Sequence, residues 1–273
     1  MHILYDIADT VTAFTAGKGC HGTEPGIDAR QVGVVFPSPN PAPSISPQSI
    51  FIPRQTHSVN VVWAEGPGEA PDSDAVITRV PGLCVAVKTA DCIPLLLYDE
   101  RQGLVAAVHA GWRGTVGRIV SRTIEEMQSR GQDLHAVIGP GISLASFEVG
   151  DEVYDAFREA GFPMDRIARR FPLSNSQTSI HNSQSSATAS QLSTCVSESS
   201  TCASELSIVN YQLSINATKW HLDLWEANRW LLEQAGVTRI HVDGTDTMTS
   251  AGFYSARRDT IKTGRNINGI MLT

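Results

Sequence analysis

Cys92 and His109 are the residues of this chain whose types and spacing point most clearly to chemistry. Cys92 directly precedes the apolar run IPLLLYD, and His109 lies near the end of the run LVAAVHA. If these runs form an antiparallel hairpin that pairs Tyr98 with Gly103, Cys92 lies directly across from His109, with Cβ atoms about 4.5–5.5 Å apart. Metal–sulfur bonds of about 2.3 Å and metal–nitrogen bonds of about 2.0–2.1 Å would let both side chains bind one ion.

A third ligand must come from elsewhere, because the chain has no CxxC pair and its possible ligands are scattered. Residue type leaves the other histidines open as candidates. They are His2, His21, His57, His135, His181, His221 and His241. The pattern favours His57, because it lies in a polar bend, RQTHS, between two apolar segments, and functional groups are common in such loops.

Structural roles are the alternative for each of these residues. A cysteine at the start of a strand is often a small core residue, and a histidine at a strand end often only makes hydrogen bonds. The pairing of Cys92 with His109 would also suit a thiolate activated by an imidazole without any metal. Asp91, next to Cys92, could act as a general acid or base, orient a histidine, or cap the turn.

The elements that must position these residues are most clearly patterned between about residues 51 and 170. LCVAVK, IPLLLYD, LVAAVHA and HAVIGPGI predict strands, and TVGRIVSRTIEEMQSRG and GDEVYDAFREAG predict amphipathic helices. Further along, WHLDLWEANRWLLEQAGV predicts a helix that ends at Gly236, followed by the strands RIHVDG and INGIMLT. Residues 1–50 are weakly patterned. The alternation predicts one α/β domain over residues 1–273.

One stretch of this domain differs in composition from the rest. Residues 174–218 are dominated by Ser, Thr, Asn and Gln, and near-copies such as STCVSE and STCASE recur in them. Their apolar content is too low for a coiled-coil seam. We predict an exposed, disordered insertion within the domain, in which Cys195 and Cys202 have no role.

The overall composition excludes several classes of partner. The net charge is −7, which argues against nucleic acid or an anionic membrane as the main partner. No apolar run approaches the roughly 20 residues of a membrane span, and Asp6 and Asp9 stand where a secretory signal would be basic and apolar. The five cysteines are an odd number, which favours a reducing, cytoplasmic location.

The motifs together resemble the YfiH-like family, whose members have also been called laccase-domain proteins, polyphenol oxidases and purine nucleoside phosphorylases. The resemblance rests on RQTHS, KTADCIPLLLYD, VAAVHAGWRGT, VIGPGI, FEVGDEV, HLDLWEANR and FYSARRD with a later TGR, over roughly residues 51–170 and 219–272. It implies a single-domain α-β-β-α sandwich with mixed and antiparallel sheets. It also implies a metal, zinc rather than copper, held by His57, Cys92 and His109.

The activity implied by the resemblance is a zinc-dependent purine nucleoside phosphorylase that also deaminates adenosine and could accept methylthioadenosine. Its partners would be purine nucleosides and phosphate. Three protein ligands leave one position of a zinc ion open, as in catalytic sites, and zinc can lower the pKa of water to about 7. Asp91, Cys92 and Arg113 would then be the catalytic residues.

Arginines are the natural candidates to hold phosphate, because a guanidinium fork matches its oxygens. Arg113, Arg257 and Arg258 are suited to this role, although each could instead form a structural salt bridge. Gln55, Arg257 and Arg258 are the residues that we expect to contact the substrate. Two departures from the family pattern leave substrate choice open: GTDTMTSAGFYSARRD lacks a Cys-Thr pair, and AGKGC replaces an Arg-x-Gly-Gly element.

Three other functions are open to the same residues. A copper-dependent phenol oxidase would need many histidines in His-x-His patterns, and the chain has none. A cofactor-free hydrolase that edits peptidoglycan precursors would use Cys92 as nucleophile and His109 as base. The implied fold is shared with cysteine-dependent deamidating toxins, which keeps this hypothesis open. A binding module without activity would leave three convergent ligand residues unexplained.

Overall fold

A computed structural model describes residues 1–20, 22–26, 28–32, 45–172 and 218–273 of the chain. Most of its strands form two mixed sheets. The five-stranded sheet has the order β1 (His2–Ala8), β2 (Val11–Ala16), β14 (Asn266–Leu272), β6 (Cys84–Thr89) and β3 (Ile50–Phe51). The six-stranded sheet has the order β13 (Arg239–Val242), β9 (Leu134–Ile138), β7 (Ile93–Asp99), β8 (Leu104–Ala110), β5 (Ala75–Thr78) and β4 (Val61–Trp63).

A small third sheet and the helices complete the described structure. The third sheet has the order β10 (Glu148–Val149), β12 (Thr218–Leu222) and β11 (Ala168–Pro172). The α-helices are α1 (Ala29–Val32), α2 (Trp112–Val116), α3 (Ile119–Met127), α4 (Asp151–Glu159), α5 (Met164–Ile167), α7 (Leu224–Gln234) and α8 (Ala256–Asp259). The 3₁₀ helices are η1 (Pro47–Ser49) and η2 (Gly131–Asp133).

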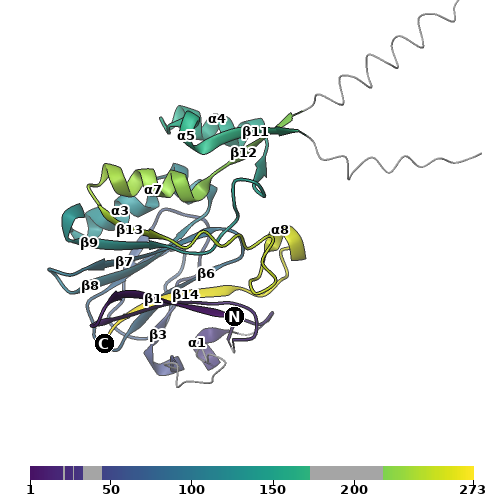
Figure 1. Ribbon diagram of the computed structural model, residues 1–273. Helices are drawn as coiled ribbons and strands as arrows, with labels where there is room; N and C mark the ends of the chain where they lie inside the picture. Colours follow the sequence, from purple (N-terminus) through teal and green to yellow (C-terminus); the bar gives the residue numbers. More distant parts are fainter. Residues whose placement is uncertain (21, 27, 33–44, 173–217) are drawn as a thin grey trace, which may run out of the picture.

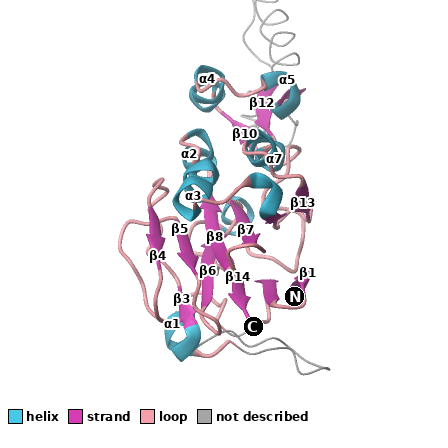
Figure 2. Ribbon diagram, turned by 90° about the vertical axis from the view of Figure 1, so that its left-hand side faces the viewer, coloured by secondary structure: helices cyan, strands magenta, loops and turns pink. Residues whose placement is uncertain are grey.

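The two large sheets pack face to face, with helices on their outer faces (Figure 1). Alternation along β7 shows the layers: Leu95 and Leu97 pack against the helices, whereas Leu96 and Tyr98 pack between the sheets. Because β7 is buried on both faces, its sequence is almost continuously apolar. The α2, α3 and α7 helices cover the six-stranded sheet (Figure 2), and the short α1 lies against the other. The predicted α-β-β-α sandwich with mixed sheets is therefore confirmed.

The N-terminal region is more regular than its weak pattern indicates. The β1 and β2 strands form an antiparallel hairpin, and β2 also pairs with the C-terminal strand β14. The pattern is obscured because β2 is almost wholly buried while β1 carries the half-exposed Leu4. Alternation between polar and apolar residues is lost when both faces of a strand are covered.

Two predicted helices have different bounds in the structure. Arg118 adopts a left-handed conformation with φ of 60°, so the predicted helix is divided into α2 and α3. The predicted helix at WHLDLWEANRW begins only at Leu224, because the residues before Asp223 form β12. Asp223 caps this helix by accepting a hydrogen bond from the backbone N–H of Glu226.

The register of the β7–β8 hairpin differs from the predicted one by two residues. Asp99 pairs with Leu104, and His109 pairs with Pro94, so Cys92 does not lie directly across from His109. The turn contains residues 100–103 because Asp99 still belongs to the ladder and accepts hydrogen bonds from the backbone N–H groups of Arg101 and Gln102. An error of two residues preserves the face on which a side chain lies, so Cys92 and His109 stay on the same side.

Two connections between the large sheets lie close together at one end of the sandwich. The chain passes from β3 to β4 through the RQTHS bend, and from β6 to β7 through Ala90–Cys92. Each connection leaves the five-stranded sheet and enters the six-stranded one. Residues from both connections therefore meet next to the end of β8, which carries His109.

The β11 and β12 strands flank the predicted insertion. They pair in antiparallel fashion, with Pro172 opposite Thr218. The predicted insertion at 174–218 lies outside the described residues except for Thr218, which belongs to β12. Within the described residues, no helix is long and apolar enough to cross a membrane.

Candidate metal centre

His109 is fixed by a buried carboxylate that the sequence analysis did not identify. Its side chain is 4% exposed, and its Nδ1 is 2.7 Å from Oδ1 of the fully buried Asp74. The backbone N–H of His109 also donates to the backbone oxygen of Asp74, at 2.7 Å. With Nδ1 held by Asp74, Nε2 is the nitrogen left to bind another group, as in many carboxylate–histidine–metal arrangements.

The same carboxylate holds the bend that carries His57. The backbone N–H groups of Thr56, His57 and Ser58 all donate to Asp74, at 3.1, 3.1 and 2.7 Å. Successive N–H groups around one anion form a nest, and His57 adopts the positive φ of 63° that such a curve requires. This φ is uncommon for a residue with a Cβ. Asp74 thus positions two of the three predicted ligands.

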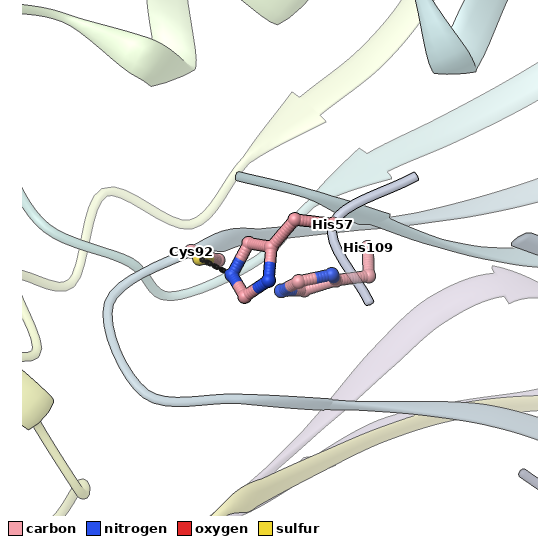
Figure 3. A group of neighbouring side chains, drawn as sticks. All are labelled: His57, Cys92 and His109. Atoms are coloured by element: carbon pink, nitrogen blue, oxygen red, sulfur yellow. Dashed lines mark hydrogen bonds between the residues drawn. The ribbon is translucent and has the colours of Figure 1, made fainter. Parts of the chain in front are cut away.

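Figure 3 shows His57, Cys92 and His109 converging from three separate segments. Their ligand atoms all lie within 4.8 Å of one another, and Cys92 Sγ is 3.8 Å from His57 Nε2. In a tetrahedral zinc site, bond lengths of about 2.1 and 2.3 Å would place such a sulfur and nitrogen about 3.6 Å apart. Among the described residues, this is the single group of three or more such ligands. The donor set and its spacing therefore fit one metal ion.

Gly111 leaves the space that this cluster occupies. A Cβ at this position would lie 3.0 Å from Cys92 Sγ and 3.0 Å from His57 Cδ2. The observed hairpin register explains this contact, because extending it one step beyond Ile93 and Ala110 places Gly111 opposite Cys92. A larger residue here would push the two ligands out of position.

The charges within the cluster are strongly coupled. Burial alone would raise the pKa of the Cys92 thiol, but the charges and hydrogen bonds of His109 and His57 lower it to about 6. Burial opposes the charge on His109, but Cys92 and Asp74 raise its pKa to about 9. Burial likewise opposes the charge on Asp74, yet hydrogen bonds from His109 and Ser58 lower its pKa to about 2. These opposite shifts favour a thiolate beside an imidazolium in the metal-free cluster.

The cluster lines a pocket of about 280 Å³ at this end of the sandwich. The other lining residues are Arg54, Gln55, Lys88, Ala90, Ala256, Ile261 and Arg265. Gln55 lies in the pocket as predicted, but its amide is engaged: Nε2 donates to the Lys88 carbonyl, and Oε1 accepts from the Lys88 N–H. These bonds attach the RQTHS bend to β6.

Asp91 is bound to the C-terminal region and not to a histidine. Its Oδ1 accepts from the Thr247 hydroxyl and its Oδ2 from the Arg257 N–H, both at 2.7 Å. Each oxygen accepts one hydrogen bond from the C-terminal region, and the acid–base role of Asp91 stays a prediction. Asp91 therefore fixes the segment that enters α8 beside Cys92.

The three arginines predicted to hold phosphate do not line this pocket. The Arg258 guanidinium donates to the carbonyls of Thr247, Met248, Ser250 and Phe253 and to the Asp259 carboxylate. These hydrogen bonds use the donors of the Arg258 guanidinium to stabilise its own loop.

The other two predicted arginines lie on exposed positions. Arg113 stacks on Trp112, with 4.3 Å from its guanidinium carbon to the ring centroid. Arg257 donates to the Glu148 carbonyl at 3.1 Å. The structure does not bring these two side chains to the metal cluster.

The spacing of motifs does not predict Asp74 or Lys88, although the sequence around Lys88 is unusual. Asp74 lies in the polar stretch PDSDAV, where nothing separates it from other loop carboxylates. Lys88 is the one charged residue in the otherwise apolar and small LCVAVKTA. A lone lysine within a buried strand is costly, which would have marked it as a functional candidate.

Comparisons with known proteins agree on the family. The family described as "Multi-copper polyphenol oxidoreductase laccase" matches residues 40–205 and 178–273. A Bacteroides thetaiotaomicron protein named purine nucleoside phosphorylase is 37% identical over 243 residues, which cover 83% of this chain and 74% of that protein. A protein named adenosine deaminase RL5, from an unknown prokaryotic organism, is 33% identical over 237 residues, covering 81% and 74%.

The fold is also that of a solved structure. The hypothetical protein YfiH of Bacillus licheniformis superposes with a TM-score of 0.71 at 22% identity, over 100% of this chain and 96% of that one. The sequence match extends on both sides of the predicted insertion, and it includes His57, Cys92 and His109. The chain therefore belongs to the family of multi-copper polyphenol oxidoreductase laccase proteins, to which the YfiH-like proteins are assigned.

Proposed function

We propose that this protein is a zinc-dependent purine nucleoside phosphorylase that also deaminates adenosine. The observation that carries the proposal is the His57–Cys92–His109 cluster, which has metal-ligand spacing and lines a pocket. Relatives named for these two activities match most of the chain. Methylthioadenosine is a further candidate substrate for the same site.

His57, Cys92 and His109 would hold the zinc ion. When bound, zinc would supply Lewis acidity on the side of the cluster that faces the pocket. Asp74 keeps His109 in the tautomer whose Nε2 is free, and it keeps the His57 bend in place. Ala256 and the exposed Ile261 offer apolar contacts to a nucleoside in the pocket.

The test combines metal content with turnover. Purified protein is incubated with adenosine, inosine or methylthioadenosine, with and without phosphate, while bound metals are measured by mass spectrometry. We expect one zinc ion per chain, inosine from adenosine without phosphate, and free purine base only with phosphate. Cys92→Ala should lose both zinc and turnover. Cys20→Ala, which removes a buried thiol outside the cluster, serves as the control. Zinc-loaded protein without turnover on any of these nucleosides would refute the proposal.

The same preparation tests whether the bound metal is copper. A multicopper oxidase needs several histidine-rich sites, whereas the described residues hold one group with two histidines. A protein isolated with copper, a strong visible absorption band and phenol oxidation would replace zinc by copper in this assignment.

A second function, that of a thiol hydrolase, is favoured by the contacts that link Asp74, His109 and Cys92. Asp74 binds His109, and the charge of His109 acts on the thiol of Cys92, which gives the Cys–His–Asp order of a thiol hydrolase. In that case activity would survive removal of metal by a chelator and would be abolished by alkylation of Cys92. The zinc enzyme would lose activity on chelation and regain it on addition of zinc.

A further inference from the structure

Lys88 is a half-buried cation whose ammonium has no hydrogen-bonded partner among the described residues. It lies near the end of β6, in which the other residues are buried. Its ammonium makes no hydrogen bond or ion pair with the part of the chain that the structure describes, although its backbone is bound by Gln55. Burial and the nearby Arg30 lower its pKa, and the Asp28 carboxylate offsets this only in part. A bound anion would further stabilise an ammonium in this position.

Other cations lie around Lys88. Arg54 and Arg265 line the same pocket, and no carboxylate is among its lining residues. Two carboxylates that lie beside these cations are already paired: Asp28 and Glu69 both bind Arg30, and Glu69 also binds Arg54 at 2.8 Å. Four cations thus stand against two carboxylates in a chain whose net charge is −7. The surroundings of Lys88 therefore carry a net positive charge, although the chain as a whole is negative.

Arg265 is fixed in place. Its guanidinium donates to the carbonyls of Ile261, Thr263 and Gly264, which hold the loop between α8 and β14. Nε makes no hydrogen bond to the described residues and remains available. A guanidinium held by its own loop is preorganised, so less entropy is lost when an anion binds.

We propose that Lys88, together with Arg265 and Arg54, forms the subsite that binds inorganic phosphate beside the metal cluster. The identity of the anion rests on the proposed phosphorolytic function; the subsite itself requires only a tetrahedral oxyanion. It replaces Arg113, Arg257 and Arg258, which do not line the pocket.

The subsite gives phosphate its place in the reaction. In phosphorolysis a phosphate oxygen forms a bond to C1′ of the ribose, the C1′–N9 bond breaks, and its electron pair passes to N9, which takes up a proton. Lys88 and the two arginines would hold the other phosphate oxygens and offset their charge. Deamination uses water at C6 and releases ammonia, so it does not need this subsite.

The difference between the two reactions provides the test. Lys88→Met keeps most of the side-chain volume and removes the charge, and Lys219→Met removes one charge from an exposed position on β12 outside the pocket. Both variants are compared with wild type at constant ionic strength. The readouts are the KM for phosphate, adenosine deamination, and phosphate binding by isothermal titration calorimetry and thermal shift.

We expect Lys88→Met to weaken phosphate binding and to raise the KM for phosphate by about tenfold or more, as for loss of a charged hydrogen bond. Deamination should fall much less than phosphorolysis, because it uses no phosphate. The melting temperature without phosphate should be equal or higher, because a half-buried charge is removed. Lys219→Met should match wild type in every readout, and Lys88→Arg should recover part of the binding.

Two failures can be told apart. Unchanged phosphate binding in Lys88→Met would overturn the subsite, whatever the enzyme's activity. Absence of both nucleoside reactions in wild type would overturn the proposed function, and calorimetry with inorganic phosphate would still decide whether Lys88 binds the anion. A nucleoside 5′-monophosphate that binds through Lys88 while inorganic phosphate does not would also overturn the proposal, since the subsite would then recognise a phosphate on the substrate.

Discussion

Two aspartates at the ends of neighbouring elements organise the two sides of the metal cluster, and they do so differently. Asp74 precedes β5, is fully buried, and binds His109 and the backbone of the His57 bend. Asp91 is adjacent to Cys92 in the chain, but its oxygens hold Thr247 and Arg257. The aspartate nearest in sequence to a ligand thus positions the surrounding loop, and the distant one positions the ligands themselves.

Proximity to a ligand along the chain therefore does not identify the residue that supports that ligand in the structure. Cys92 is placed by the connection between the sheets, and Asp91 only ties that connection to the C-terminal segment. A carboxylate that touches a metal-binding histidine tunes its basicity and orientation. We therefore expect changes that act through Asp74 to alter metal affinity far more than changes at Asp91.

The largest expected effect is the pH dependence of metal binding. In the metal-free protein His109 keeps its proton up to a pKa of about 9, while Cys92 is ionised above about 6. A metal needs the neutral imidazole and the thiolate, so binding between these values releases one proton. Zinc affinity should therefore rise about tenfold per pH unit from pH 6 to 9, measured by competition with a chelator of known pH dependence. A flat profile would show that Cys92 and Asp74 do not hold His109 in its protonated form.

Asp74→Asn should weaken zinc binding by about 10–100-fold. The amide has one acceptor oxygen in place of two, so N–H groups of the bend lose their partner and His109 loses its charged one. Affinity is best compared at pH 9, where the proton on His109 competes less with the metal than at neutral pH. Wild-type affinity in this variant would remove the distinction between the two aspartates.

Gly111→Ala should weaken zinc binding by about tenfold, because the added methyl would lie 3.0 Å from Cys92 Sγ and His57 Cδ2. Relieving such overpacking costs about 1–3 kcal/mol. Gly66→Ala is the control, since a Cβ there has no neighbour within 4 Å. Cobalt substitution monitored by visible spectroscopy should show distorted coordination in Gly111→Ala alone. Identical spectra for both variants would indicate that the cluster can accommodate a methyl group at position 111.

Asp91→Asn should have the smallest effect. The amide oxygen can still accept from one of the two donors that Asp91 now binds, so one hydrogen bond is lost and the free energy of unfolding falls by about 1 kcal/mol. Zinc affinity should change less than about threefold, as expected for a residue without contact to a ligand side chain. Loss of zinc as severe as in Asp74→Asn would instead support the histidine-orienting role predicted from the sequence.

Much of the fold follows from the sequence because the central strands are apolar and well delimited. The runs at 93–99 and 104–110 predict β7 and β8 with correct bounds, and the motifs identify the family. The hairpin register does not follow, since a turn of the same length fits one residue further along the chain. Cys92 and His109 still lie on the same face of the hairpin, because the predicted register is wrong by two residues and side chains alternate between the two faces.

The rest of the site depends on contacts that leave no regular spacing. Asp74 meets His109 across 35 positions, and the nest around it forms only when two connections between sheets come together. Arginine motifs predict phosphate contacts by residue type, but the donors of Arg258 are consumed by carbonyls of its own loop. Only a structure shows which donors are free, and it points to Lys88 instead.

The pairing of Pro172 with Thr218 has a consequence for how this fold can vary. The chain leaves β11 and re-enters β12 at facing positions of one ladder, about the distance that a turn of two to five residues closes in a hairpin. All three proposed ligands lie upstream of this junction, and Lys219 is the first lysine beyond it. The span from 173 to 217 can therefore differ in length from one homologue to another without rearranging either sheet, so this junction is a natural place to graft or remove sequence.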